Sequence, residues 1–138
     1  METLEKNPFL EIVFDHETQV MFDKWTTETE NIDDETYFDM VRIWTERAKA
    51  CNPSGCVSDL RQMLYSLHPD VQQKLTPVVM EAFMNPKFKK FAIVMSQDFI
   101  SQLSVEQAIE DAQDEYAPPV ETKYFADFEQ AKIWVIQP

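Results

Sequence analysis

One stretch near the middle of the chain decides the fold: Lys89-Lys90-Phe91-Ala92-Ile93-Val94-Met95-Ser96. Apolar side chains occupy both odd and even positions from Phe91 to Met95, so a strand formed here must be covered on both of its faces. Strands of this kind lie in the middle of α/β sheets. The stretch therefore predicts a buried central strand in a sheet that is flanked by helices.

The chain before this stretch predicts a hairpin, a helix and a further strand. Residues 9–14 and 19–25 are two strands joined by turn residues, and we expect them to pair antiparallel. Residues 1–8 are polar and are interpreted as a leader. Asp33 has the context of an N-cap, and an apolar stripe predicts a helix to about residue 50. The stripe consists of Tyr37, Val41, Trp44 and Ala48. A short strand follows at residues 56–60.

The rest of the chain alternates helices with strands. A helix is predicted from Pro69 to about residue 84, with a kink or two abutting helices at Pro77. After the central strand, Ser104 begins a predicted helix, residues 121–125 a strand, and Asp127 a last helix. The order is β-β-α-β-α-β-α-β-α. It predicts a single α/β domain over residues 1–138 with a five-stranded mixed sheet, antiparallel at the hairpin and parallel elsewhere.

Composition limits the classes of function. The net charge of −13 argues against nucleic-acid binding and against docking on an anionic membrane, because both need clustered cations. No apolar run is long enough to span a membrane, and the start of the chain lacks an apolar signal core. We therefore expect a cytoplasmic protein without a membrane span.

The residue types that carry cofactor chemistry are scarce. Gly55 is the one glycine, which argues against phosphate-binding loops, since these need several glycines for close backbone approach. Cys51 and Cys56 fall short of a four-ligand zinc site and are interpreted as structural thiols. We expect no metal and no cofactor.

The position of polar residues at strand ends gives the candidate site. In open α/β sheets, ligands bind beyond the carboxyl ends of the parallel strands. We therefore predict a ligand or partner site on a rim formed by Asp59, Arg61, Met63, Ser96, Gln97 and Asp127. The alternative interpretation is that Asp59 and Arg61 pair with each other and tie down their loop.

A second candidate surface is apolar. The irregular segment Met63–Leu67 is rich in apolar residues, and Met80, Phe83 and Met84 are expected nearby. Exposed, such residues would form an interaction patch, since soluble monomers rarely show large apolar areas. Ordinary core packing is the favoured interpretation for most of them.

The order and spacing of these elements resemble the SpoIIAA-like (STAS-like) fold, in particular its small stand-alone bacterial proteins of uncharacterised function. The matching pieces are the opening hairpin, Pro77 in mid-helix, and the stretches at residues 57–61, 90–94, 104–106 and 124–131. The resemblance covers about residues 9 to 135. It implies a mixed five-stranded sheet, a regulatory or binding role, and self-association.

The resemblance also points to one serine. In the anti-sigma-factor antagonists of this fold, a serine within an Asp-Ser-Ser-Gly motif at a helix start is phosphorylated. Ser66 lies in the corresponding region, between Tyr65 and Leu67, and the motif itself is absent. Ser66 is therefore a phosphoacceptor candidate on the resemblance alone, and an ordinary loop serine is the favoured interpretation.

Two functions are consistent with these observations. The first is a non-enzymatic regulatory or protein-interaction module that binds a protein partner or a second copy of itself. The alternative is a binding site for a small apolar or lipid-like ligand, since the fold is similar in outline to CRAL-TRIO carriers.

Overall fold

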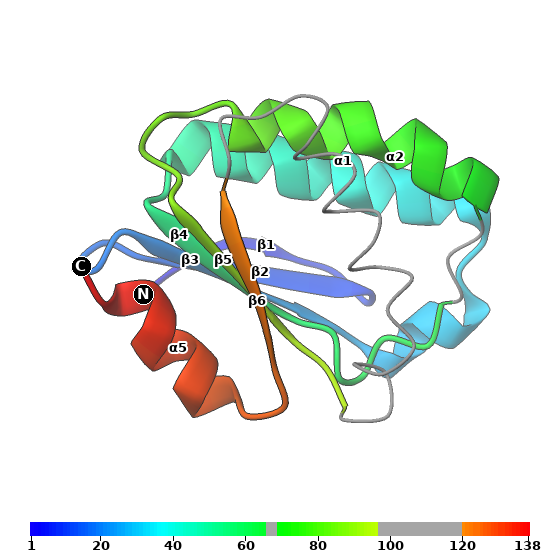
Figure 1. Cartoon of the computed structure of the whole chain (residues 1–138). Helices are drawn as coiled ribbons and strands as arrows, with labels where there is room; N and C mark the ends of the chain where they lie inside the picture. Colours follow the sequence, from blue (N-terminus) through cyan, green and yellow to red (C-terminus); the bar gives the residue numbers. More distant parts are fainter. Residues whose placement is uncertain (66–68, 97–119) are drawn as a thin grey trace.

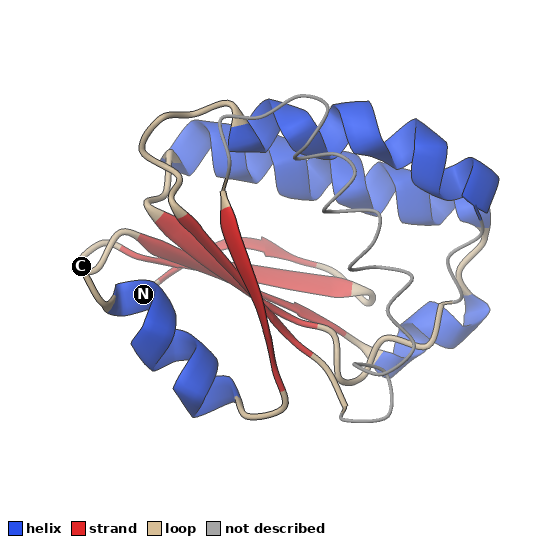
Figure 2. Cartoon of the chain, in the orientation of Figure 1, coloured by secondary structure: helices blue, strands red, loops and turns tan. Residues whose placement is uncertain are grey.

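The computed structural model of the chain describes residues 1–65, 69–96 and 120–138, and these residues form a mixed six-stranded sheet with helices on both faces (Figures 1 and 2). The strands lie in sequence order, β1-β2-β3-β4-β5-β6. Their bounds are β1 Glu2–Lys6, β2 Leu10–Asp15, β3 Val20–Trp25, β4 Gly55–Asp59, β5 Lys90–Val94 and β6 Glu121–Phe125. The helices in these described residues are the 3₁₀ helix η1 Thr27–Asn31 and the α-helices α1 Asp34–Cys51, α2 Pro69–Phe83 and α5 Phe128–Ile136.

The sheet confirms the predicted class and mixed pairing and corrects the strand count. The pairs β1–β2 and β2–β3 are antiparallel, whereas β3–β4, β4–β5 and β5–β6 are parallel. The described residues contain six strands rather than the five predicted, because residues 2–6, which the sequence assigns to the leader, pair with β2. Most of residues 2–6 are charged, so their sequence alone does not predict a strand. Only Leu4 packs on the core, and the strand forms by pairing with β2.

The central stretch lies where the sequence predicts it. β5 pairs in parallel with β4 on one side and β6 on the other. Phe91 and Ile93 face α1 and α2, whereas Ala92 and Val94 face α5. All four side chains are buried, so this strand is covered on both faces.

Helix α1 begins and packs as its sequence predicts. The side chain of Asp33 accepts a hydrogen bond from the backbone N–H of Thr36, which satisfies a donor that the helix start leaves free. The predicted stripe, Tyr37, Val41, Trp44 and Ala48, is buried. Helix α2 runs through Pro77 as one element, and Pro77 itself is exposed.

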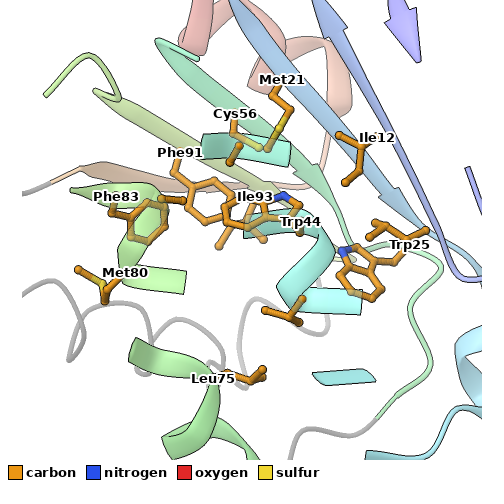
Figure 3. Close-up of a cluster of buried hydrophobic side chains, with 14 of the residues drawn as sticks. Ile12, Met21, Trp25, Trp44, Cys56, Leu75, Met80, Phe83, Phe91 and Ile93 are labelled. Carbon is orange, nitrogen blue, oxygen red and sulfur yellow. The ribbon is translucent and has the colours of Figure 1, made fainter. Parts of the chain in front are cut away.

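The core consists of two layers on opposite faces of the sheet. The larger layer lies between the sheet and helices α1 and α2, and Figure 3 shows side chains from both helices meeting those of β2 to β5. Within it the ring of Trp44 lies 6.0 Å from that of Phe91 and 6.4 Å from that of Phe83, between centroids. The smaller layer lies under α5, around Val57, Ala131 and Val135.

Helix α5 approaches the sheet closely at the single glycine. A Cβ on Gly55 would lie 2.6 Å from Val135 Cγ1 and 3.1 Å from the carbonyl oxygen of Lys90. Asp127 caps the helix by accepting hydrogen bonds from the backbone N–H groups of Glu129 and Gln130. The predicted helix that begins at Ser104 lies outside the described residues.

Candidate functional site

The rim predicted at the strand ends contains one strong ion pair. Asp59 is the last residue of β4, and its side chain is buried. Arg61 donates from Nε to Asp59 Oδ1 at 3.0 Å and from Nη2 to Asp59 Oδ2 at 2.8 Å. The backbone N–H of Arg61 donates to Oδ1 at 3.1 Å as well. The two residues therefore pair with each other, as the alternative interpretation stated.

The charges at the rim follow from this geometry. Burial acts to raise the pKa of Asp59, but the hydrogen bonds and charge of Arg61 outweigh it, so the carboxyl pKa lies below its usual value. Hydrogen bonding to Asp59 raises the pKa of Arg61, and the negative charge of Asp127 adds to this effect. Asp59 is thus an ionised carboxylate that holds the loop after β4 in place.

The other predicted rim residues have separate roles or positions. Asp127 is exposed and caps α5. Met63 is half-buried and packs on the larger core layer, and Ser96 is exposed just beyond β5. Gln97 and the phosphoacceptor candidate Ser66 lie outside the described residues. The structure therefore pairs Asp59 with Arg61, places Asp127 near enough for its charge to act on Arg61, and packs the half-buried Met63 on the larger core layer.

A buried carboxylate that the sequence analysis missed lies inside the larger core layer. Asp23 on β3 is only 2% exposed. Its Oδ2 accepts from Trp44 Nε1 at 2.7 Å and from Cys56 Sγ at 3.4 Å, and its Oδ1 accepts from Ser58 Oγ at 2.6 Å. The carboxylate thereby links strands β3 and β4 to helix α1.

Burial dominates the electrostatics of this carboxylate. It raises the pKa of Asp23 to about 6, although the hydrogen bonds from Ser58, Trp44 and Cys56 act in the opposite direction. The nearby charge of Asp59 raises the pKa further. Asp23 consequently changes its protonation state close to neutral pH, with hydrogen-bond donors on both of its oxygens.

The sequence carries a signal for this cluster. Asp23 stands between Met21 and Trp25 on the inward-facing positions of β3, and Ser58 occupies an inward-facing position of β4. The parallel register places Asp23 directly beside Ser58. Polar residues at inward positions of neighbouring strands indicate a buried hydrogen-bond network, because buried polar groups need partners.

The described part of the apolar segment after β4, residues 63–65, is only partly exposed. Leu64 is 49% exposed, whereas the ring of Tyr65 stacks on Tyr37 with centroids 4.1 Å apart. The hydroxyl of Tyr65 donates to Asp34 Oδ1 at 2.6 Å. Of the residues expected near this segment, Met80 and Phe83 are buried and Met84 is exposed.

Both cysteines are free thiols in buried or half-buried positions. Burial raises the pKa of Cys51 to about 11 and that of Cys56 well above its usual range, so neither is a ready thiolate. Among the residues that the structure describes, no group of three histidine, cysteine or acidic side chains is placed to hold a metal ion.

Comparison with protein-family models, with curated proteins and with solved structures finds no match to this chain. Within the described ranges, none of the helices is long and apolar enough to cross a bilayer. The resemblance to SpoIIAA-like proteins therefore stays a prediction, and the site must be interpreted from its own geometry.

Proposed function

We propose that the chain is a non-enzymatic module that acts by binding a protein partner or a second copy of itself, as the SpoIIAA-like resemblance implies, and that it works in the cytoplasm of a bacterium. The two buried carboxylates support a structural role for the polar groups. Asp59 is bonded by Arg61, and Asp23 by Trp44, Ser58 and Cys56. Both carboxylates thus hold parts of the fold together, and their hydrogen-bonding groups are engaged in that role.

The observation that carries the proposal is the exposure of large apolar side chains, two of them on helix α5. Ile133 and Ile136 on α5 are 50% and 41% exposed, Leu64 in the loop after β4 is 49% exposed, and Met84 just after α2 is 61% exposed. Two of these four lie three residues apart on one helix. Grouped apolar side chains at the surface are typical of protein-binding sites.

Site-specific photo-cross-linking tests this proposal. A photoreactive phenylalanine is introduced at position 64, 84 or 133 in the cells that produce the protein, with exposed Glu46 on α1 as the polar control position. We expect a covalent adduct with a protein at one or more of the apolar positions and none at position 46. If all three apolar positions gave no protein adduct, the proposal would be wrong.

The alternative, a small apolar ligand, stays a prediction. Native mass spectrometry of freshly purified protein checks it, because a retained ligand adds its own mass to that of the chain.

A further inference from the structure

The outer face of α5 exposes apolar side chains, and the described charges around this helix balance one another. The helix buries Ala131 and Val135 against the sheet and leaves Ile133 and Ile136 exposed. Lys90 Nζ donates to the carbonyl oxygens of Trp134 and Gln137 at 3.0 and 2.9 Å, at the end of the helix where carbonyls lack partners. Lys90 and Lys123 also lie 5.2 and 5.4 Å from the centroid of the Trp134 ring. The exposed isoleucines therefore belong to a helix that is firmly held in place.

Among the described residues, the charges on α5, its cap, β6 and the start of β5 balance, whereas the remaining charges are mostly acidic. Three lysines and three carboxylates lie on α5, its cap, β6 and the start of β5: Lys90, Lys123, Lys132, Glu121, Asp127 and Glu129. The other described residues include nine basic and sixteen acidic side chains. Two copies of a chain with a net charge of −13 repel each other. They approach at the lowest electrostatic cost when the balanced faces meet and the acidic surfaces point apart.

We infer that the outer face of α5 is a contact between two copies of this chain, with Ile133 and Ile136 of each copy at its centre. This inference rests on the proposed function and specifies its surface and its partner. A contact between identical faces is the commonest arrangement in soluble oligomers, and each copy then covers the exposed isoleucines of the other.

The sheet edges are less suited to self-association. At β1 the register shifts between Thr3 and Glu5, and Arg47 Nε donates to the carbonyl oxygen of Leu4 at 3.1 Å. A bulge and an occupied carbonyl both discourage the addition of another strand. At β6, antiparallel pairing centred on Lys123 would place two lysines directly opposite each other, which is destabilising.

Sedimentation velocity over a range of concentrations tests the inference on the full chain. We expect the wild-type protein to form a dimer, and Ile133→Glu and Ile136→Glu each to raise the dimer dissociation constant by about tenfold or more, since each places a carboxylate in the apolar centre. Leu64→Glu is the matched control, because Leu64 is as exposed as Ile133 but lies after β4. It should leave the dimer unchanged. Circular dichroism confirms that each variant is folded.

Salt gives a second readout. Added salt screens the repulsion between the acidic surfaces, so the wild-type dimer should become stronger, and a dimer that dissociated in salt would contradict the inference. A monomeric wild type, or a dimer that Leu64→Glu disrupts and the α5 variants do not, would overturn it. Neither result decides the proposed function, which the photo-cross-linking experiment tests separately. Adducts with a different protein in that experiment would still support the proposed function.

Discussion

At the scale of single residues, Asp23 is a buried carboxylate whose pKa is raised by burial. It lies on β3 beneath helix α1, and it accepts hydrogen bonds from the indole of Trp44 on α1 and from the hydroxyl of Ser58 and the thiol of Cys56 on β4. Ionised, it is a buried charge without a cation among the described hydrogen-bond partners. Such a group links the sheet to the helix and at the same time costs stability whenever it is charged.

The first prediction concerns the pH dependence of stability. The pKa of Asp23 is raised to about 6 in the folded chain, so its contribution to folding is fully present below its unfolded pKa near 3.8 and is lost as the pH rises through 6. The variant Asp23→Asn has no carboxyl group at this position, so it does not lose stability in this way as the pH rises. The free energy of unfolding of the wild type should therefore fall relative to that of Asp23→Asn by up to about 3 kcal/mol between pH 4 and pH 7. Urea unfolding at several pH values measures it.

Asp39→Asn is the control for that experiment, because Asp39 is an exposed carboxylate on α1. Its stability profile should follow the wild type across the pH range. Parallel profiles of wild type and Asp23→Asn would show that Asp23 does not titrate in this window.

The second prediction concerns the hydroxyl of Ser58. Ser58→Ala removes the 2.6 Å hydrogen bond to Asp23 and leaves one carboxylate oxygen without that donor. We expect a loss of about 1.5–3 kcal/mol in unfolding free energy at pH 7, since hydrogen bonds to charged groups are the stronger ones. Ser54→Ala is the comparison, because Ser54 donates to a neutral carbonyl of Gln19 at 3.2 Å. An equal loss of unfolding free energy in both variants would contradict the idea that the charge of Asp23 strengthens its hydrogen bond with Ser58.

At the scale of elements, the packing of α5 depends on the absence of a side chain at position 55. Gly55→Ala would place a Cβ within 2.6 Å of Val135 Cγ1, so the helix must shift away from β4. We expect a loss of about 1–3 kcal/mol, the usual range for overpacking. Chemical unfolding measures this value.

A second substitution tests the cause of that loss. Val135→Ala removes the methyl group that would collide, so the double variant Gly55→Ala/Val135→Ala should lose less than the sum of the two single variants. Strict additivity would show that the loss comes from something other than this contact.

At the scale of the whole molecule, the N-terminal strand completes the sheet. Without residues 2–6, β2 becomes the edge of the sheet and loses the backbone pairing that β1 supplies. We expect the truncated chain to lose on the order of 2 kcal/mol and to aggregate, because an uncovered strand edge recruits other strands. Thermal unfolding and light scattering measure both effects. Leu4→Ala, which keeps the backbone pairing, should be milder, and a truncated chain that melted like the wild type would contradict the prediction.

Much of this architecture is predictable from the sequence because local patterns agree with the fold. The apolar run at residues 91–95, the cap at Asp33 and the cap at Asp127 each mark an element that the structure contains. Residues 2–6 escaped prediction because a short charged edge strand has no pattern of its own and depends on pairing with β2. The likeness to SpoIIAA-like proteins and the function stay predictions.

The candidate site was predicted less well than the fold. The Asp59–Arg61 pair follows from two neighbouring opposite charges at a strand end. The Asp23 network requires the register between β3 and β4 and the position of Trp44, whose side chain comes from a residue 21 positions further along the chain. The sequence alone indicates which residues face inward, but it does not show which of these side chains contact one another.

Among the described residues the two core layers share no side chain, and the tryptophans divide between them. Trp25 and Trp44 belong to the layer under α1 and α2, whereas Trp134 packs against the layer under α5. Intrinsic fluorescence thus distinguishes the two sides of the sheet. A chain that keeps only Trp134, or only Trp44, would reveal whether the two layers melt in one cooperative step or one after the other.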